Sequence, residues 1–163
     1  MTPLENDTLS PDDLDLARAI VQCGQDESFL QKILDVYEDI TQADPTGQPR
    51  CMGGGACCRF DMFDHRLYVT LGELALLRRS EPVDISRTEL NRCPYQQGPK
   101  CHARQNRPLG CRVFFCREKP DIRDNDVYET AHKRISQLHE THDLPYAYAE
   151  LISALNILHK FCR

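Results

Sequence analysis

Hydrophobic positions recur with the period of an amphipathic helix in two stretches near the N-terminus. Ser10 and Pro11, followed by acidic residues, predict the start of the first helix, and Gly24 predicts its end. The second helix is expected to begin near Asp26 or Ser28. Its apolar face comprises Phe29, Leu30, Ile33, Leu34, Tyr37 and Ile40. This face is wide enough to be buried against other elements.

Two further helical patterns lie near the C-terminus. Asp124 or Asn125 is expected to cap the first of them, whose apolar face comprises Val127, Ala131, Ile135 and Leu138. Leu144 and Pro145 separate it from the last helix, which carries Ala147, Leu151, Ile152, Leu155, Leu158 and Phe161. We expect these two helices to pack against the N-terminal helices and to carry the middle of the chain.

The middle of the chain has shorter elements. Alternation of apolar and polar residues over residues 67–70 predicts a short strand. Thr70 and Glu73 form a capping box, which predicts a helix that ends near Arg79. The run Ser86-Arg87-Thr88-Glu89 is a second capping-box pattern and predicts another turn or short helix.

Glycine and proline shape the remainder of the middle segment. Between residues 93 and 116, three prolines and two glycines exclude a long regular element. The expected fold is therefore mainly α with little β, in a single domain over residues 1–163. Within it, a loop-rich cysteine-cluster module at residues 51–117 lies between helical flanks at residues 1–49 and 120–163.

The composition is that of a folded globular protein: 40% of the 163 residues are hydrophobic and 28% are charged. The acidic, polar N-terminus does not resemble a secretory signal, and no stretch has the apolar length that a membrane span requires. We therefore expect a cytoplasmic protein without a membrane partner. Thiols stay reduced in that compartment, which disfavours a disulfide framework.

The formal net charge of -5 is unevenly distributed along the chain. Residues 1–49 carry a net charge of -9 and residues 118–163 a net charge of -2, whereas residues 50–117 carry +6. Lys100 is the only lysine among the bases of this middle segment, and no basic run is interleaved with aromatic residues. A nucleic-acid partner is therefore not expected. The positive charge of this segment is better explained as an offset to thiolates bound to a metal ion than as a surface that binds nucleic acid.

Seven of the nine cysteines lie within the middle segment, and we expect them to bind a metal ion. Soft thiolate ligands select zinc, copper(I) or iron–sulfur clusters over hard cations. Three arrangements of these thiols stay open. They are one four-thiolate site with three structural thiols, two metals with bridging sulfurs, or an iron–sulfur cluster with spare thiols. The predicted ligands are Cys51, Cys57, Cys58, Cys93, Cys101, Cys111 and Cys116.

Other residues that could carry chemistry are interpreted as structural. Cys23 lies beside the apolar face of the first helix and is expected to be a buried structural thiol, and Cys162 is expected to pack against or cap the last helix. Arg107 and Arg112 are expected to donate hydrogen bonds around the metal site. Three histidines are expected on a solvated helix surface: His132, His139 and His142.

Several fragments of the middle segment resemble, in their joint order, the YkgJ-type cysteine-cluster family. They are CMGGGACCR, Val69-Thr70-x-x-Glu73, Cys93-Pro94, Cys101 and Arg107-Pro108-x-x-Cys111-Arg112-x-Phe114. The resemblance covers residues 51–117 and implies a zinc- or iron-chelating domain with one more cysteine than this segment contains. Gly54 stands where the family has that cysteine, and His65 or His102 could supply the missing ligand.

The expected function is thiolate binding of zinc or iron, the latter including an iron–sulfur cluster, in a structural or metal-handling role with a protein partner. Related cysteine clusters occur in flagellin lysine methylases, but no catalytic motif, phosphate loop or nucleotide fingerprint is recognised in this chain. Two alternatives stay open. An iron–sulfur-dependent redox or modifying enzyme requires an open coordination site, and a zinc-containing nucleic-acid-binding module predicts binding that weakens steeply with salt.

Overall fold

The computed structural model of the chain describes residues 9–43, 58–63, 65–113 and 122–163. Within these residues the fold is mainly helical with little β-structure, as the sequence predicts. The α-helices are α1 (Pro11–Gly24), α2 (Glu27–Gln42), α3 (Phe60–Phe63), α4 (Leu71–Leu77), α5 (Leu109–Val113), α6 (Ile122–Thr141) and α7 (Leu151–Phe161). The short strands are β1 (Tyr68–Thr70), β2 (Gln96–Gln97), β3 (Lys100–Cys101) and β4 (Tyr148–Glu150), and the 3-10 helices are η2 (Ile85–Leu90) and η3 (Arg104–Asn106).

The N-terminal helices begin where local capping signals lie in the sequence. Ser10 Oγ accepts a hydrogen bond from Asp13 N at 3.1 Å, and Asp13 Oδ2 accepts one from Ser10 N at 3.2 Å, which completes a capping box for α1. Asp26 caps α2 by accepting a hydrogen bond from Phe29 N at 2.9 Å. Both predicted helix starts are confirmed.

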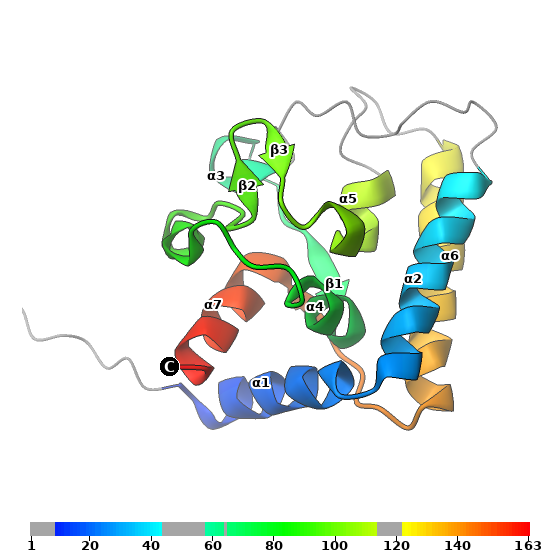
Figure 1. Cartoon of the computed structure of the whole chain (residues 1–163), viewed down its shortest axis with the longest axis horizontal. Helices are drawn as coiled ribbons and strands as arrows, with labels where there is room; N and C mark the ends of the chain where they lie inside the picture. The colour runs from blue at the N-terminus through cyan, green and yellow to red at the C-terminus, as the bar shows by residue number, and fades with distance from the viewer. Residues whose placement is uncertain (1–8, 44–57, 64, 114–121) are drawn as a thin grey trace, which may run out of the picture.

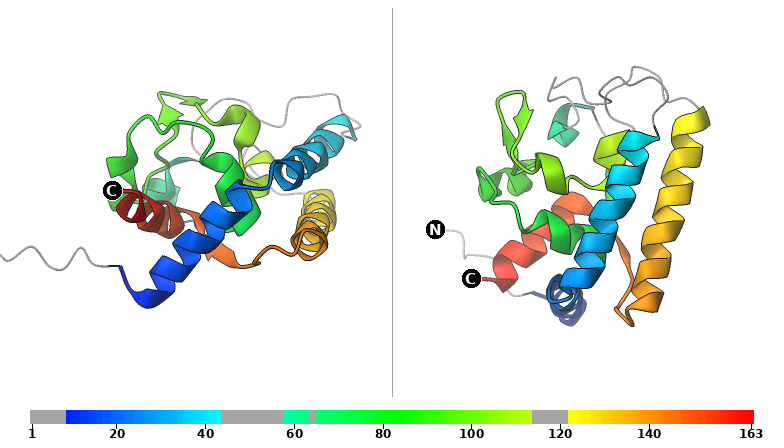
Figure 2. Two further views of the ribbon diagram at one scale, coloured as in Figure 1. Left: turned by 60° about the horizontal axis from the view of Figure 1, so that its bottom comes forward. Right: turned by 45° about the vertical axis from the view of Figure 1, so that its right-hand side comes forward.

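The helix α4 lies near the centre of the molecule, beside α1 and α2 (Figure 1). α1 crosses one end of the molecule, α2 and α6 form an antiparallel pair along one side, and α7 packs against α1 (Figures 1 and 2). All residues of α4 are buried, and this helix packs against α1 and α2. The predicted packing of the C-terminal helices against the N-terminal ones is confirmed. A helix from the middle of the chain thus belongs to the core.

Gly72 allows α4 to approach α2 closely. A Cβ atom at this position would lie 2.6 Å from Phe29 Cζ and 2.7 Å from Ile33 Cδ1, well inside the contact distance of two carbon atoms. Both of these α2 side chains are fully buried. The absence of a side chain at Gly72 is therefore a condition for this helix packing.

The strand predicted at residues 67–70 is present as β1, but its partner β4 lies where the sequence predicts helix. β1 and β4 pair antiparallel, with Tyr68 opposite Glu150. The predicted inclusion of Ala147 in the last helix is wrong, because residues 148–150 are extended by this pairing and α7 begins only at Leu151. Glu150 then caps α7 by accepting hydrogen bonds from Ile152 N at 3.1 Å and from Ser153 N at 2.8 Å.

Two further predicted helix starts are wrong. The cap of η2 is Asp84, not Ser86, because the Asp84 carboxylate accepts the hydrogen bond from Ser86 N. α6 begins at Ile122, so neither Asp124 nor Asn125 is its cap. In both cases the acidic or hydroxyl side chain that looks like a cap already belongs to the first helical turn.

α6 is amphipathic along its length. Its buried apolar residues include Ala131 and Ile135, and Val127 and Leu138 pack partly buried beside them, as predicted. The other side of the helix is polar and exposed. No helix in the described ranges is both long enough and apolar enough to cross a lipid bilayer.

Candidate metal centre

Glu73 is the buried acidic residue that joins the elements around the cysteines. Its side chain is 1% exposed. Oε2 accepts a hydrogen bond from Thr70 N at 2.9 Å, and Oε1 accepts one from Tyr37 OH at 3.2 Å and one from Leu109 N at 2.7 Å. These three donors satisfy a polar group that would otherwise be costly to bury. One carboxyl group therefore connects α2, α4 and the first residue of α5.

α5 carries Cys111, and the next residue, Arg112, holds this helix in place. The guanidinium carbon of Arg112 lies 4.2 Å from the centroid of the Tyr37 ring, which is a cation–π contact. Its Nε donates to Arg107 O at 2.8 Å, and a terminal nitrogen donates to Gln105 O. Burial lowers the pKa of the Arg112 guanidinium, against the opposing influence of Tyr37. Arg112 thus closes the loop that precedes Cys111.

Three other predicted ligands lie on neighbouring stretches of backbone. Cys93 N donates a hydrogen bond to Cys58 O at 3.0 Å, which joins two cysteines that are distant in sequence. Cys101 belongs to β3, which pairs with β2 in an antiparallel hairpin. His102 N donates to Tyr95 O at 2.8 Å and extends this hairpin towards Cys93. The fold therefore brings the backbones of these three cysteines to one region.

Tyr95 is buried beside two of these thiols. Burial strongly raises the pKa of its phenol, and Cys93 raises it further, whereas Arg78 acts in the opposite direction. Cys101 also contributes to the raised pKa of Tyr95. Cys93 and Cys101 therefore lie near the same buried ring. In the sequence, Cys93 comes before the hairpin turn and Cys101 after it.

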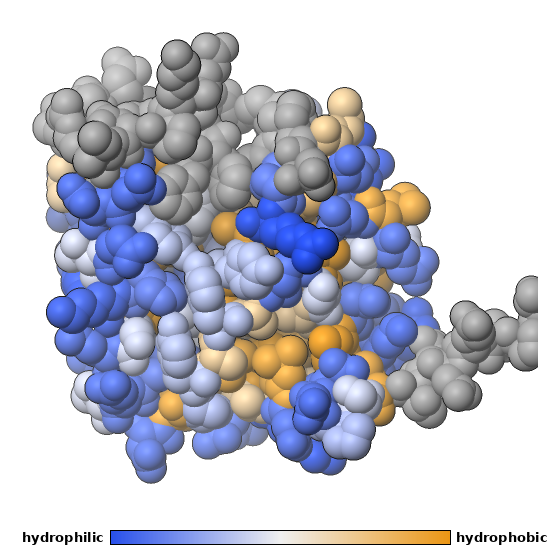
Figure 3. Space-filling model, turned by 180° about the vertical axis from the view of Figure 1, so that it is seen from behind, coloured by the Kyte–Doolittle hydropathy of each residue, from blue (hydrophilic) through white to orange (hydrophobic). Residues whose placement is uncertain are grey.

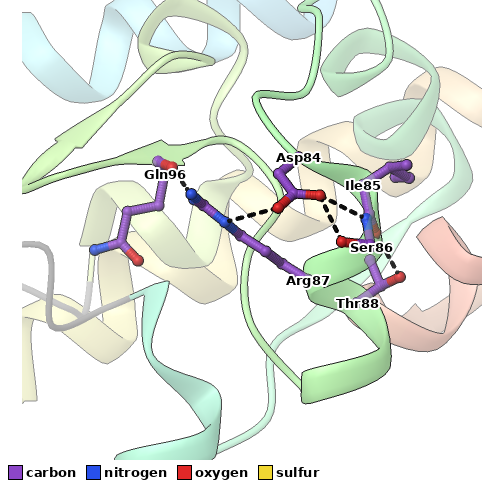
Figure 4. A network of polar contacts seen from close by, with 6 residues as sticks. All are labelled: Asp84, Ile85, Ser86, Arg87, Thr88 and Gln96. Atoms are coloured by element: carbon purple, nitrogen blue, oxygen red, sulfur yellow. Dashed lines mark hydrogen bonds and ion pairs between the residues drawn. The ribbon is translucent and has the colours of Figure 1, made fainter.

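A polar network connects the hairpin to η2 (Figure 4). Asp84 accepts hydrogen bonds from Ser86 N at 3.1 Å and from Ser86 Oγ at 2.6 Å. The Arg87 Nε atom lies 3.7 Å from the Asp84 carboxylate, and an Arg87 terminal nitrogen donates to Gln96 O in β2. Asp84 N also donates to Pro94 O at 3.1 Å. Directional polar contacts therefore order the loops on both sides of Cys93.

The structure describes four of the seven predicted metal ligands. Cys58 and Cys93 are buried, with 7% and 9% of their surface exposed, and Cys101 and Cys111 are half-buried. No disulfide joins any of the described cysteines. Among the residues that the structure describes, no three His, Cys, Asp or Glu side chains are grouped closely enough to hold a metal ion. Three predicted ligands lie outside the described residues: Cys51, Cys57 and Cys116.

The two histidines considered as replacements for the ligand missing at Gly54 have different surroundings. The His65 ring is half-buried, and its centroid lies 4.6 Å from that of Phe60. His102 is exposed beside Cys101, and its backbone amide belongs to the hairpin. A ligand role for either histidine stays a prediction.

The predicted solvated position of His139 is wrong. Only 1% of this residue is exposed, and its Nδ1 lies 2.7 Å from Pro145 O. A carbonyl can only accept, so Nδ1 carries the proton, and burial lowers the pKa of the imidazole. His142 Nδ1 lies 2.9 Å from Asp26 Oδ2, and His132 is also partly buried. The connection from α6 to β4 folds back onto these histidines, a long-range arrangement that helical periodicity does not reveal.

The two cysteines outside the middle segment have structural surroundings, as predicted. Cys23 is completely buried, its thiol lies 3.8 Å from the Pro145 carbonyl oxygen that accepts its hydrogen bond, and burial raises its pKa to about 11. Cys162 is the C-cap residue of α7, and Arg78 donates a hydrogen bond to its sulfur at 3.3 Å. Neither position resembles that of a metal ligand.

The sequence pattern does not reveal the contribution of Tyr37 to this region or the donors that the Glu73 carboxylate binds beyond its own capping box. The prediction that Tyr37 belongs to the apolar face of α2 is confirmed, because only 2% of this residue is exposed. The guanidinium group of Arg112 also lies over the Tyr37 ring, and the Tyr37 hydroxyl group donates a hydrogen bond to Glu73. An acidic residue within an otherwise fully apolar seven-residue helix was the available signal for a buried anchor.

No family model, no curated protein and no solved structure matches this chain. The residues and contacts described above therefore carry the functional argument.

Proposed function

We propose that this chain is a metal-binding cysteine-cluster protein of the YkgJ type. Its cysteines would bind zinc or iron, the latter including an iron–sulfur cluster, in a structural or metal-handling role. The observation that best supports this proposal is that the backbones of Cys58, Cys93 and Cys101 lie in one region, where Cys93 N donates a hydrogen bond to Cys58 O and Cys101 belongs to the adjacent hairpin. A reducing compartment such as the cytoplasm would keep these thiols available.

The donor chemistry fits a soft or borderline metal ion. In the proposal the thiolates come from the seven cysteines between Cys51 and Cys116, and bound metal would supply order to a segment of short elements. Glu73 and Arg112 would orient Cys111, because they fix the start of α5 and the loop before it. Arginines near the site would offset the negative charge of the thiolates.

The test is metal analysis of anaerobically purified protein, with one cysteine replaced at a time. Wild-type protein is expected to contain zinc or iron in a fixed ratio to protein. Cys111→Ser and Cys93→Ser are expected to lose most of the metal, because a hydroxyl group is a poor ligand for zinc or iron in a thiolate site. Cys162→Ser is the matched control, since this cysteine is exposed and lies at the end of α7.

The metal also distinguishes the proposed functions. Colourless protein with zinc indicates a structural or metal-handling site, whereas brown protein with iron and acid-labile sulfide favours the redox or modifying enzyme. DNA or RNA binding that weakens steeply with salt would favour the nucleic-acid-binding alternative. Folded wild-type protein without metal, or equal metal content in Cys111→Ser and Cys162→Ser, would contradict the proposal.

A further inference from the structure

Four of the six tyrosines lie together around His132, although they come from different elements. Tyr128 and His132 belong to α6, whereas the other tyrosines belong to β1, β4 and the residues before β4. We call this group the tyrosine surface: Tyr68, Tyr128, Tyr146 and Tyr148 with His132. α6 lies behind α2 in Figure 1, and the face seen from behind has weakly polar and apolar side chains in its centre between strongly hydrophilic borders (Figure 3).

The rings of the tyrosine surface are held in fixed positions. The His132 ring stacks on Tyr128 with centroids 5.7 Å apart, and it meets the edge of Tyr148 at 4.9 Å. Tyr146 OH lies 3.1 Å from His132 Nε2, and the hydroxyl groups of Tyr128 and Tyr148 are hydrogen-bonded to each other. A ligand would therefore meet ordered side chains, which lowers the entropic cost of binding.

Three of these rings remain accessible to solvent. Tyr68, Tyr146 and Tyr148 have 42%, 45% and 44% of their surface exposed. The hydroxyl groups of Tyr146 and Tyr148 already have partners, so ring faces and edges are the groups that they offer to a ligand. Exposed tyrosines that cluster in this way are typical of sites where proteins bind other proteins.

Two carboxylates act on the tyrosine surface. Burial is the main cause of the raised pKa values of Tyr128 and Tyr148, and the Glu73 and Glu129 carboxylates contribute to both. Glu129 is exposed on α6. Aromatic rings attract cations through the negative potential of their faces, and a nearby carboxylate adds to that attraction.

The protein contains a buried example of the same combination. Arg112 lies over the ring of Tyr37, and the hydroxyl group of Tyr37 binds the Glu73 carboxyl group. In the described ranges of the chain, no arginine or lysine stacks in this way on Tyr68, Tyr146 or Tyr148. Within the described residues, the tyrosine surface thus has rings and a nearby carboxylate, and no guanidinium group is stacked on its exposed rings.

We propose that the tyrosine surface binds the guanidinium group of an arginine side chain presented by a protein partner. Arginine is favoured over lysine because its planar guanidinium group stacks on aromatic rings and is weakly hydrated. This proposal is independent of the metal-binding function, since none of the residues involved is a predicted ligand.

The experiment is an NMR titration of the full-length protein with 13C-labelled tyrosine rings. The probe is a short unstructured peptide with one central arginine, and its control is the same peptide with citrulline, which has the same shape but no charge. The arginine peptide is expected to shift the signals of the four tyrosines of the surface. The buried Tyr37 and Tyr95 serve as internal references, with 2% and 3% of their surface exposed.

Two variants make the test specific. Glu129→Gln removes one charge from an exposed position and is expected to weaken binding about threefold, and Tyr148→Thr is expected to weaken it by about fivefold or more. Glu129→Gln should keep the wild-type amide spectrum, because its side chain is exposed, whereas Tyr148→Thr should change it only near β1, β4 and α6. Absence of tyrosine shifts at millimolar arginine peptide overturns the proposal. Equal shifts with the citrulline peptide also overturn it, as does binding of single-stranded nucleic acid in preference to the peptide.

Discussion

The helical part of the molecule, residues 9–43 and 122–163, and the cysteine-bearing part, residues 58–63 and 65–113, are held together by different interactions. In the helical part, fully buried apolar side chains such as Phe29, Ile33 and Ile135 form the contacts between helices. In the cysteine-bearing part, which includes α4, a few polar side chains connect short elements. Glu73, Arg87 and Arg112 each bind to two or more separate stretches of the chain.

This difference predicts different responses to mutation. Apolar burial is distributed over many atoms, so a small change in the helical part is expected to have a graded effect. A buried polar anchor satisfies several donors at once, and its removal leaves all of them without a partner. The cysteine-bearing part should therefore depend on fewer residues, and each of those residues should have a larger effect.

The largest effect is expected for Glu73→Ala. This change leaves Thr70 N, Tyr37 OH and Leu109 N without their acceptor in a buried site, and it should lower the free energy of unfolding by about 4 kcal/mol. Urea denaturation followed by circular dichroism measures this loss. Glu81→Ala makes the same change of charge at an exposed position and should have little effect. Equal stability of the two variants would remove the distinction between the two parts.

A smaller effect is expected where the two parts meet, at the contact of α4 with α2. Gly72→Ala improves helix propensity but places a methyl group against Phe29 and Ile33, so we expect a net loss of about 2 kcal/mol. In a background with Phe29→Leu the loss should be smaller, because the shorter side chain makes room. A double-mutant cycle by urea denaturation measures this coupling. Stabilisation by Gly72→Ala in the wild-type background would show that the helices tolerate a wider separation.

The smallest effect is expected from the titration of His139 in the helical part. Burial lowers the pKa of this imidazole from its ordinary value of 6.5. As the pH falls below that value, the unfolded chain takes up a proton that the folded chain does not, and stability is lost until the lowered pKa of the folded state is reached. His139→Asn keeps a donor for Pro145 O and should lessen this dependence in urea denaturation at several pH values.

The control for this titration is His102→Asn, since His102 is exposed and belongs to the cysteine-bearing part. It should have the stability of the wild type, because its exposed side chain is not part of the core. The contact between His142 Nδ1 and Asp26 Oδ2 is unchanged in both variants. A His139→Asn curve that coincides with the wild-type curve would show that His139 does not limit stability in acid.

The sequence predicts the helical part well because its signals are local and repeated. The apolar period identifies Phe29 and Ile33 as core residues, and Ser10 and Asp26 identify helix starts. The period of apolar residues does not predict the strand β4, because its three residues are extended only by pairing with β1. Tertiary contacts override local preference there.

In the cysteine-bearing part, sequence reasoning finds the residue types but not their arrangement. The density of cysteines indicates metal chemistry, and Thr70 with Glu73 is correctly recognised as a capping box. The contacts of Glu73 with Tyr37 and Leu109 each join residues that are far apart in the chain, so no local pattern encodes them. The same reason prevents the spacing of the cysteines from defining a ligand set.

The pairing of β1 with β4 has a consequence for the order in which the chain folds. Tyr68 meets Glu150, and α7, which follows β4 directly, packs on α1 near the other end of the sequence. Contacts of such high contact order form slowly, since a long loop must close before they bring any stabilisation. During synthesis α1 and α4 would leave the ribosome well before β4 and α7, and would expose apolar surface until then. Completion of the fold is therefore expected only after β4 and α7 have been synthesised.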